Sequence, residues 1–125
     1  IAAYGLPERS VAFAVALNAL PESSLVRPTT VGTMPAAVQD VALIVDSTVS
    51  AADLQAALRE GAGELLESIT LFDRYDKIGD GKISLAFTLV FRASDRTLTG
   101  EEVSAMREAA TAQAAAKFGA VVRTA

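Results

Sequence analysis

The most constraining feature of the sequence is the stretch 82–91, in which large apolar residues alternate strictly with smaller or polar ones. A period of two places every large residue on one face of a β-strand. The other face carries milder residues, Ser84 and Thr88 among them. This stretch therefore predicts a sheet with one buried face. The large residues are Ile83, Leu85, Phe87, Leu89 and Phe91.

Three further strands are expected. Val38–Val45 is apolar and alternates in the same way, and Glu67–Tyr75 contains the β-branched and aromatic residues that favour sheets. The stretch 120–123 predicts a short last strand. Gly79 and Gly81 indicate a β-hairpin turn between Glu67–Tyr75 and the strand expected at 82–91.

Two helices are expected from their capping signals. Ser50 stands three residues before Asp53, and Thr99 three residues before Glu102, which is the spacing of a capping box. Gly61 and Gly63 are expected to end the first helix, and Gly119 the second. One apolar stripe follows the second helix: Val103, Met106, Ala110, Ala114 and Phe118.

The order strand, helix, strand, strand, helix, strand predicts the α+β class and a ferredoxin-like βαββαβ sandwich. Its four-stranded antiparallel sheet should carry both helices on one face, which leaves the other face open to a partner. The expected core consists of Leu54, Leu58, Leu85, Phe87, Leu89, Val103 and Met106.

The residues before this pattern predict an appendage and a linker. Val11–Leu20 alternates large residues with Ala, as a strand-like extension would, and the chain begins with Ile1 rather than Met. We therefore expect 1–20 to end a preceding module of a longer protein. Pro and Ser residues make 21–35 a linker, so the main domain should cover 36–125.

Composition excludes several classes of site. The chain has no Cys and no His, which removes the usual zinc, haem and Ser-His-Asp sites. A net charge of −4 argues against binding a long run of phosphates. The stretch 76–87 resembles an EF-hand loop, but Ile78 and Phe87 replace required carboxylates, so we expect no metal there. No stretch is long and apolar enough to predict a membrane span.

Several ordered blocks carry a family resemblance across residues 34–123. They include Pro35-Ala36, Asp40-Val41-Ala42-Leu43, Arg59-Glu60-Gly61-Ala62-Gly63, Leu71-Phe72-Asp73 with Tyr75, and Phe91-Arg92-Ala93 with Asp95-Arg96-Thr97-Leu98-Thr99. These blocks resemble the ferredoxin-fold anticodon-binding domain that ends the β subunit of bacterial phenylalanyl-tRNA synthetases. Gln39, in place of a usual Arg, and a shorter turn after Tyr75 depart from the family pattern.

The resemblance implies a non-catalytic, cytoplasmic RNA-binding domain. In the family, an aromatic residue stacks on the first anticodon base, an Asp hydrogen-bonds that base, and a small residue lets it approach. Those roles match Tyr75, Asp73 and Ala42 here. The implied partners are the anticodon of tRNA(Phe) and, through the parent β chain, the α subunit, which carries the aminoacylation chemistry. ATP and Mg²⁺ would belong to the parent ligase, and no cofactor is expected in this part.

Two alternatives remain open at this point. Ile69, Leu71, Asp73 and Tyr75 are spaced two residues apart, so a regular strand would place all four on the same face. If Ile69 and Leu71 face the core, Asp73 and Tyr75 would too, unless a bulge or strand end occurs near Phe72. We expect such a bulge; otherwise Tyr75 is a core aromatic. The alternative function is a ferredoxin-like regulatory or subunit-assembly domain that does not bind RNA.

Overall fold

The structure is a computed structural model that describes residues 4–25 and 32–124. The chain divides into two units, Ile1–Thr30 and Val31–Ala125, and each is treated by itself. In the described part of the first unit, one turn of 3₁₀ helix, η2, spans Leu17–Ala19, and no strand forms among residues 4–25.

The strand expected within Val11–Leu20 does not form. A strand needs a neighbour for its backbone hydrogen bonds, and the large side chains of this stretch contact little, since Val11 is 96% exposed and Phe13 93%. The assignment of 1–20 to a preceding module stays a prediction. The predicted linker 21–35 lies partly outside the described residues, which resume at Gly32.

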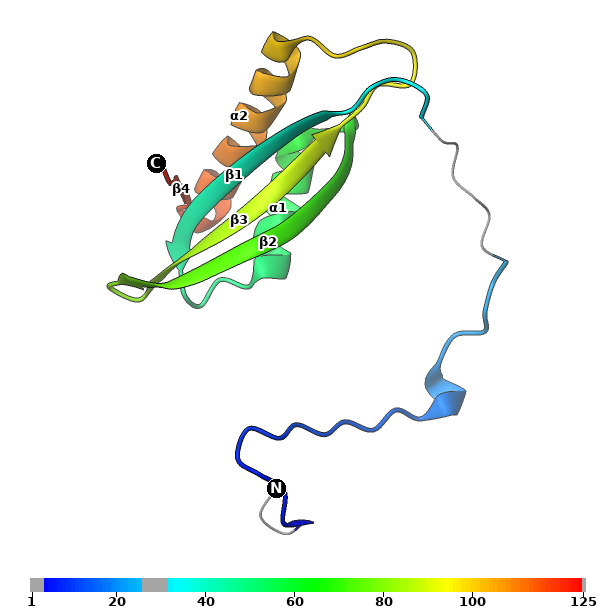
Figure 1. Ribbon diagram of the computed structural model, residues 1–125, viewed down its shortest axis with the longest axis vertical. Helices are drawn as coiled ribbons and strands as arrows, with labels where there is room; N and C mark the ends of the chain where they lie inside the picture. The colour runs from blue at the N-terminus through cyan, green and yellow to red at the C-terminus, as the bar shows by residue number, and fades with distance from the viewer. Residues whose placement is uncertain (1–3, 26–31, 125) are drawn as a thin grey trace. The chain divides into compact units, whose positions relative to one another are not determined.

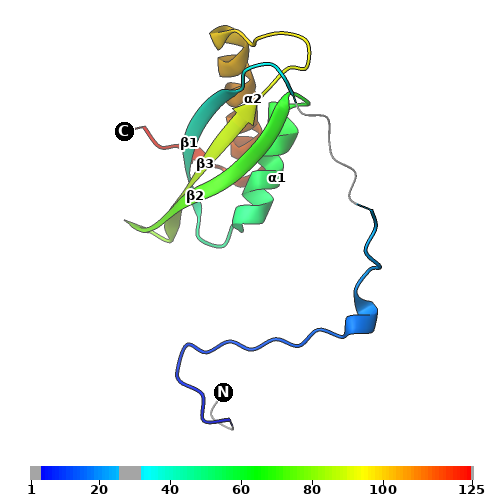
Figure 2. The same ribbon diagram turned by 45° about the vertical axis from the view of Figure 1, so that its right-hand side comes forward.

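The second unit is a four-stranded antiparallel sheet with two helices on one face (Figures 1 and 2). The strand order is β2-β3-β1-β4, so the first and last strands lie side by side. This arrangement confirms the predicted α+β, ferredoxin-like fold. The elements are β1 (Ala37–Asp46), α1 (Ala51–Ala62), β2 (Leu66–Gly79), β3 (Lys82–Phe91), α2 (Gly100–Phe118) and β4 (Val121–Val122).

The core lies between the sheet and the helices. The large residues of β3 face the helices and are buried, Phe87 completely so. Leu54 and Leu58 of α1 and Val103 of α2 meet them there. The predicted core is therefore confirmed, except that Met106 is only partly buried and packs at its margin.

The capping signals act as predicted. The Thr99 side chain accepts from the Glu102 backbone N–H at 3.2 Å, and the Thr99 N–H donates to the Glu102 carboxylate at 2.9 Å, which completes a capping box. Ser50 accepts from the Asp53 N–H at 3.0 Å. Each bond satisfies a backbone group that the first helical turn leaves unpaired.

The role expected for Gly61 is wrong. Helix α1 continues through Gly61 to Ala62, and Gly63, with φ of 79°, ends it. A Cβ at Gly61 would lie 2.6 Å from the Ala109 carbonyl oxygen and 2.8 Å from the Ala110 Cα. Gly61 therefore allows the two helices to approach closely.

The stretch that resembles an EF-hand loop, 76–87, forms part of the β2–β3 hairpin. Strand β2 extends to Gly79, beyond the predicted end at Tyr75, and the central turn residues Asp80 and Gly81 have φ of 52° and 67°. Positive φ at both positions is what a type I′ hairpin turn requires. An EF-hand needs a helix on each side of its loop, and strands occupy both sides here.

Candidate functional site

An irregularity in β2 decides which face its polar residues occupy. Leu71 pairs with Phe87 on the helix side, but Asp73 pairs with Ala86, the next residue of β3. Phe72 is therefore an extra residue on β2, and it reverses the alternation that follows. The bulge predicted near Phe72 is confirmed at this position.

The bulge brings the three predicted site residues to one face, which we call the open face because neither helix packs on it (Figures 1 and 2). Ala42, Ala86 and Asp73 form one row across strands β1, β3 and β2. The Cα atoms of Ala42 and Asp73 are thus separated by two strand spacings, roughly 10 Å.

A second row runs beside the first. It consists of Ile44, Ser84 and Tyr75, again across strands β1, β3 and β2. Tyr75 is 42% exposed and shares the open face with Ser84, so the alternative of a core aromatic is wrong.

Small residues form the floor between the two sides of this site. Ser84 and Ala86 project from the open face of β3 and Ala42 from β1, and none has a side chain longer than two heavy atoms. The floor is low but covered by neighbouring side chains, since Ser84 and Ala86 are only 3% and 8% exposed, so a flat ring beside Tyr75 would have to displace that cover. Asp73, at the end of its row, is exposed and supplies a carboxylate at the margin of that space.

Other polar side chains of the sheet form a hydrogen bond and an ion pair. The Thr88 hydroxyl donates to the Asp40 carboxylate at 2.6 Å. Arg92 forms an ion pair with Glu67 at 3.0 Å and also donates to the Met34 carbonyl oxygen. These contacts fix the end of the sheet that lies away from Tyr75.

Sequence reasoning missed Arg123. Its guanidinium carbon lies 5.5 Å from the centre of the Tyr75 ring, which is within the range of a cation–π contact. Its backbone N–H donates to the Ala42 carbonyl oxygen at 2.8 Å. The signal that would have found it is topological, because a ferredoxin-like sheet places the last strand beside the first.

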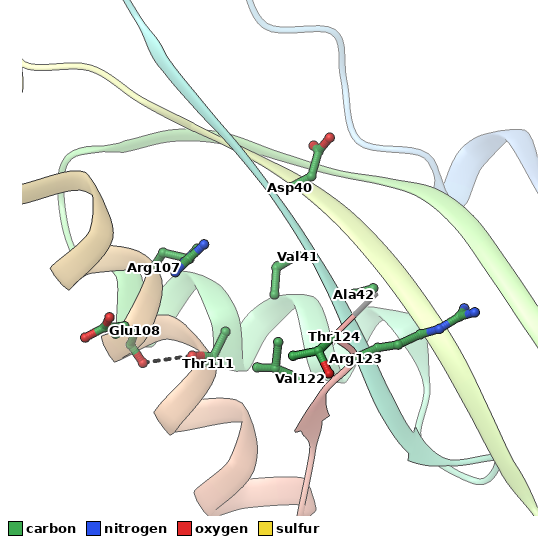
Figure 3. Close-up of a pocket in the computed structure, with 9 residues that line it drawn as sticks. All are labelled: Asp40, Val41, Ala42, Arg107, Glu108, Thr111, Val122, Arg123 and Thr124. Carbon is green, nitrogen blue, oxygen red and sulfur yellow. Dashed lines mark hydrogen bonds between the residues drawn. The ribbon is translucent and has the colours of Figure 1, made fainter. Parts of the chain in front are cut away.

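A cavity of about 350 Å³ lies beside β1, where β4 is too short to pair with the first half of that strand (Figure 3). Asp40, Arg107 and Glu108 give it charges of both signs, and the Thr111 hydroxyl donates to the Glu108 carbonyl oxygen at 3.0 Å. Arg123 both lines this cavity and contacts the Tyr75 ring. Its full lining is Asp40, Val41, Ala42, Arg107, Glu108, Thr111, Val122, Arg123 and Thr124.

Two carboxyl groups outside the site have perturbed acidities. The Arg96 guanidinium, followed by the Thr99 backbone N–H, lowers the pKa of Glu102 to about 2. Hydrogen bonds from the Thr48 backbone and hydroxyl lower the pKa of Asp46, with Lys82 contributing attraction. Both groups are structural, since one caps α2 and the other closes the turn after β1.

No metal-binding group of three or more His, Cys, Asp and Glu side chains occurs among residues 4–25 and 32–124. Within those same ranges, no helix is both long and apolar enough to cross a membrane. What the described site offers instead is an aromatic ring, a carboxylate and a guanidinium around a floor of small residues.

The sequence model described as the ferredoxin-fold anticodon binding domain matches residues 32–123, which is most of the chain. The chain belongs to this family. The matched region begins and ends close to the limits of the second structural unit, so the anticodon-binding-domain family and the observed fold coincide.

Curated relatives of this anticodon-binding-domain chain are β subunits of phenylalanine–tRNA ligases. The Streptomyces avermitilis protein is 56% identical over 124 residues, the Thermobifida fusca protein 51% over 127, and the Corynebacterium jeikeium protein 52% over 121. These matches cover 96%, 98% and 94% of this chain. The chain spans only 15%, 15% and 14% of those relatives, respectively.

Proposed function

We propose that this domain binds an unstacked base of a tRNA anticodon on its open face. The observation that carries the proposal is the bulge at Phe72, which turns both Tyr75 and Asp73 toward the small residues of β1 and β3. Sequence-specific RNA recognition commonly uses bases splayed out of loops, stacked on aromatic side chains and hydrogen-bonded at their edges. The described residues supply one group for each of those contacts.

Each predicted site residue has a separate role in this proposal. The Tyr75 ring provides the stacking platform, which contributes about 1–3 kcal/mol per base. Asp73 accepts hydrogen bonds from the Watson–Crick edge of guanine, so it confers base preference. Ala42 keeps the floor low beside the ring. Because one stacked base needs no broad basic surface, the proposal is compatible with a net charge of −4.

The proposed setting is a phenylalanine–tRNA ligase, by similarity to the β subunits named above. In that setting the domain holds tRNA(Phe) while the α subunit performs aminoacylation, with ATP and Mg²⁺ used at that distant site. The complex would act in the cytoplasm. The unit before the domain, 1–20, would belong to the preceding module of the β subunit.

A titration with RNA tests the proposal. An end-labelled anticodon stem-loop of tRNA(Phe) is titrated with the chain, and fluorescence anisotropy measures binding. The matched control RNA carries adenosine in place of the guanosine at the first anticodon position. Adenine lacks the donors that Asp73 would accept from, so affinity should fall by about 1.5–3 kcal/mol, the value of a hydrogen bond to a charged group.

The outcomes separate the two candidate functions. Saturable binding with preference for the guanosine stem-loop supports anticodon recognition. Equal binding of both RNAs would refute the role of Asp73. No binding to either RNA at low salt would instead favour the regulatory or subunit-assembly function.

A further inference from the structure

The Arg123 side chain crosses the site just described. Arg123 follows β4, whereas Tyr75 lies on β2, and strands β1 and β3 separate them. The guanidinium nevertheless lies 5.5 Å from the Tyr75 ring centre. Figure 3 shows this side chain extended away from α2, over β1 and toward β3. Both side chains therefore lean over the floor of small residues from opposite sides.

The contact is consistent with the burial of the small residues on this face. Ser84 and Ala86 are only 3% and 8% exposed, although neither α1 nor α2 covers their face of the sheet. Their cover must come from longer side chains on the open face itself. Tyr75 is the cross-strand neighbour of Ser84, and the Arg123 guanidinium reaches its ring from the far side of β1 and β3. A base stacked on Tyr75 would need the space that this guanidinium borders.

Arg123 also has a charge that the described ion pairs do not use. Those pairs join Lys82 to Asp46, Arg92 to Glu67, Arg96 to Glu102 and Lys117 to Glu60. The described contact of the Arg123 guanidinium is with an aromatic ring, which is a weak partner at an exposed position. A phosphate is a much stronger partner for a guanidinium.

We propose that Arg123 is an exchangeable cover of the base site. In the free domain it rests on Tyr75; when RNA binds, a base replaces it on the ring and the guanidinium moves to a phosphate of the same loop. This inference rests on the proposed function. The exchange is favourable because base stacking on an aromatic ring is stronger than an exposed cation–π contact.

Exchange and a sandwich differ in how the effects of the two residues combine. In an exchange, the contact between Arg123 and Tyr75 exists only in the free state, so binding must break it. Without either residue, binding no longer has to break this contact. That gain in binding free energy partly offsets the loss of the RNA contact made by the residue that was removed. Removing both therefore weakens binding by more than the product of the single effects. If a base were held between the ring and the guanidinium, binding would break the same contact, but both residues would also hold one shared base, and this coupling would make the double effect smaller than in an exchange.

The experiment is a double-variant cycle on the 125-residue chain. Binding of the labelled anticodon stem-loop is measured for wild type, Arg123→Gln, Tyr75→Leu and the double variant over a range of salt concentrations. We expect Arg123→Gln to weaken binding about 3- to 30-fold at low salt, from a lost charge-assisted contact. The salt slope should fall by about 0.7, the value for one phosphate of a single strand. The double loss should exceed the product by about 2- to 5-fold.

Two further variants separate charge from shape. Arg123→Lys keeps the charge and should retain the salt slope of wild type. Arg59→Gln removes one charge from an exposed position in the last turn of α1, on the opposite side of the sheet, and should change affinity less than 2-fold. NMR adds a direct readout, because the Tyr75 ring should shift the Arg123 side-chain protons upfield in the free chain. That shift should vanish in Tyr75→Leu and in the RNA complex.

Several results would overturn the exchange. Unchanged or tighter RNA binding by Arg123→Gln would rule out the proposed phosphate contact. A loss of affinity in the double variant smaller than the product of the two single losses would indicate a sandwich. An upfield shift that persists in the RNA complex would show that the guanidinium stays on the ring. If wild type binds no RNA, the proposed function itself fails, a result that differs from binding that is insensitive to Arg123.

Discussion

The sharpest test of the sheet's two faces compares two phenylalanines on neighbouring strands. Phe87 of β3 is completely buried between the sheet and the helices, whereas Phe72, the bulge residue of β2, is 57% exposed. The substitutions Phe87→Ala and Phe72→Ala delete the same atoms. Their effects on the free energy of unfolding should differ because only Phe87 leaves a cavity.

The expected magnitudes follow from burial. Replacing a buried Phe by Ala costs about 3–5 kcal/mol, which includes the lost transfer free energy and the cavity. A domain of this size has roughly 5–15 kcal/mol of stability, so Phe87→Ala removes a large part of it. At about 4–8 °C per kcal/mol, its Tm should fall by at least about 12 °C. Phe72→Ala should change the free energy of unfolding by no more than about 1 kcal/mol.

Urea unfolding followed by far-UV circular dichroism measures both variants. Equal costs for the two substitutions, or a larger cost for Phe72→Ala, would refute the assignment of faces. Because Ala86 and Ser84 alternate with Phe87 along β3, that result would also remove the floor of the proposed site.

Three other substitutions test particular contacts. Gly61→Ala should destabilise the domain by about 1–3 kcal/mol in the same urea assay, because the added Cβ meets the backbone of α2 at 2.6 Å; an unchanged midpoint would contradict that close approach. Glu102→Gln tests acid sensitivity: with its pKa lowered from 4.5 to about 2, Glu102 stabilises the fold above about pH 4.5 and loses that contribution as the pH falls through 2. The stability difference between wild type and Glu102→Gln should therefore be constant above pH 4.5 and shrink below it, and a difference that grows on acidification would reverse the sign. Ala42→Leu should weaken stem-loop binding at least about 10-fold by filling the floor, with a Tm close to that of wild type; unimpaired binding would place the base elsewhere.

Most of the fold was predictable because its signals are local. The alternation along β3 and the caps at Ser50 and Thr99 depend on neighbouring residues, and the structure confirms them. The prediction for Gly61 failed because the need for glycine comes from another helix. A Cβ at Gly61 would lie 2.6 Å from the backbone of α2, which is far from Gly61 in the sequence. The strand within Val11–Leu20 failed for a related reason, since alternation specifies a face but supplies no neighbour.

The candidate site was predictable only in part. In a regular strand, Tyr75 would lie on the same face as Leu71, toward the core. Tyr75 could therefore lie on the open face only if β2 had a bulge near Phe72, and the strand register confirms that bulge. Arg123 gave no local signal. It joins the site because β4 lies beside β1 and because a long side chain reaches over two strands, which only the assembled sheet reveals.

The central claim is that the Tyr75 ring is a stacking platform for an anticodon base. Its most direct test is the affinity of Tyr75→Ala for the anticodon stem-loop of tRNA(Phe), measured beside Tyr75→Phe and with the Tm of each variant. We predict that Tyr75→Ala weakens binding by roughly 1–3 kcal/mol with little change in Tm, while Tyr75→Phe binds almost as wild type. If Tyr75→Ala instead unfolds the domain, and its remaining folded fraction binds RNA normally, the ring serves the fold and the claim is contradicted.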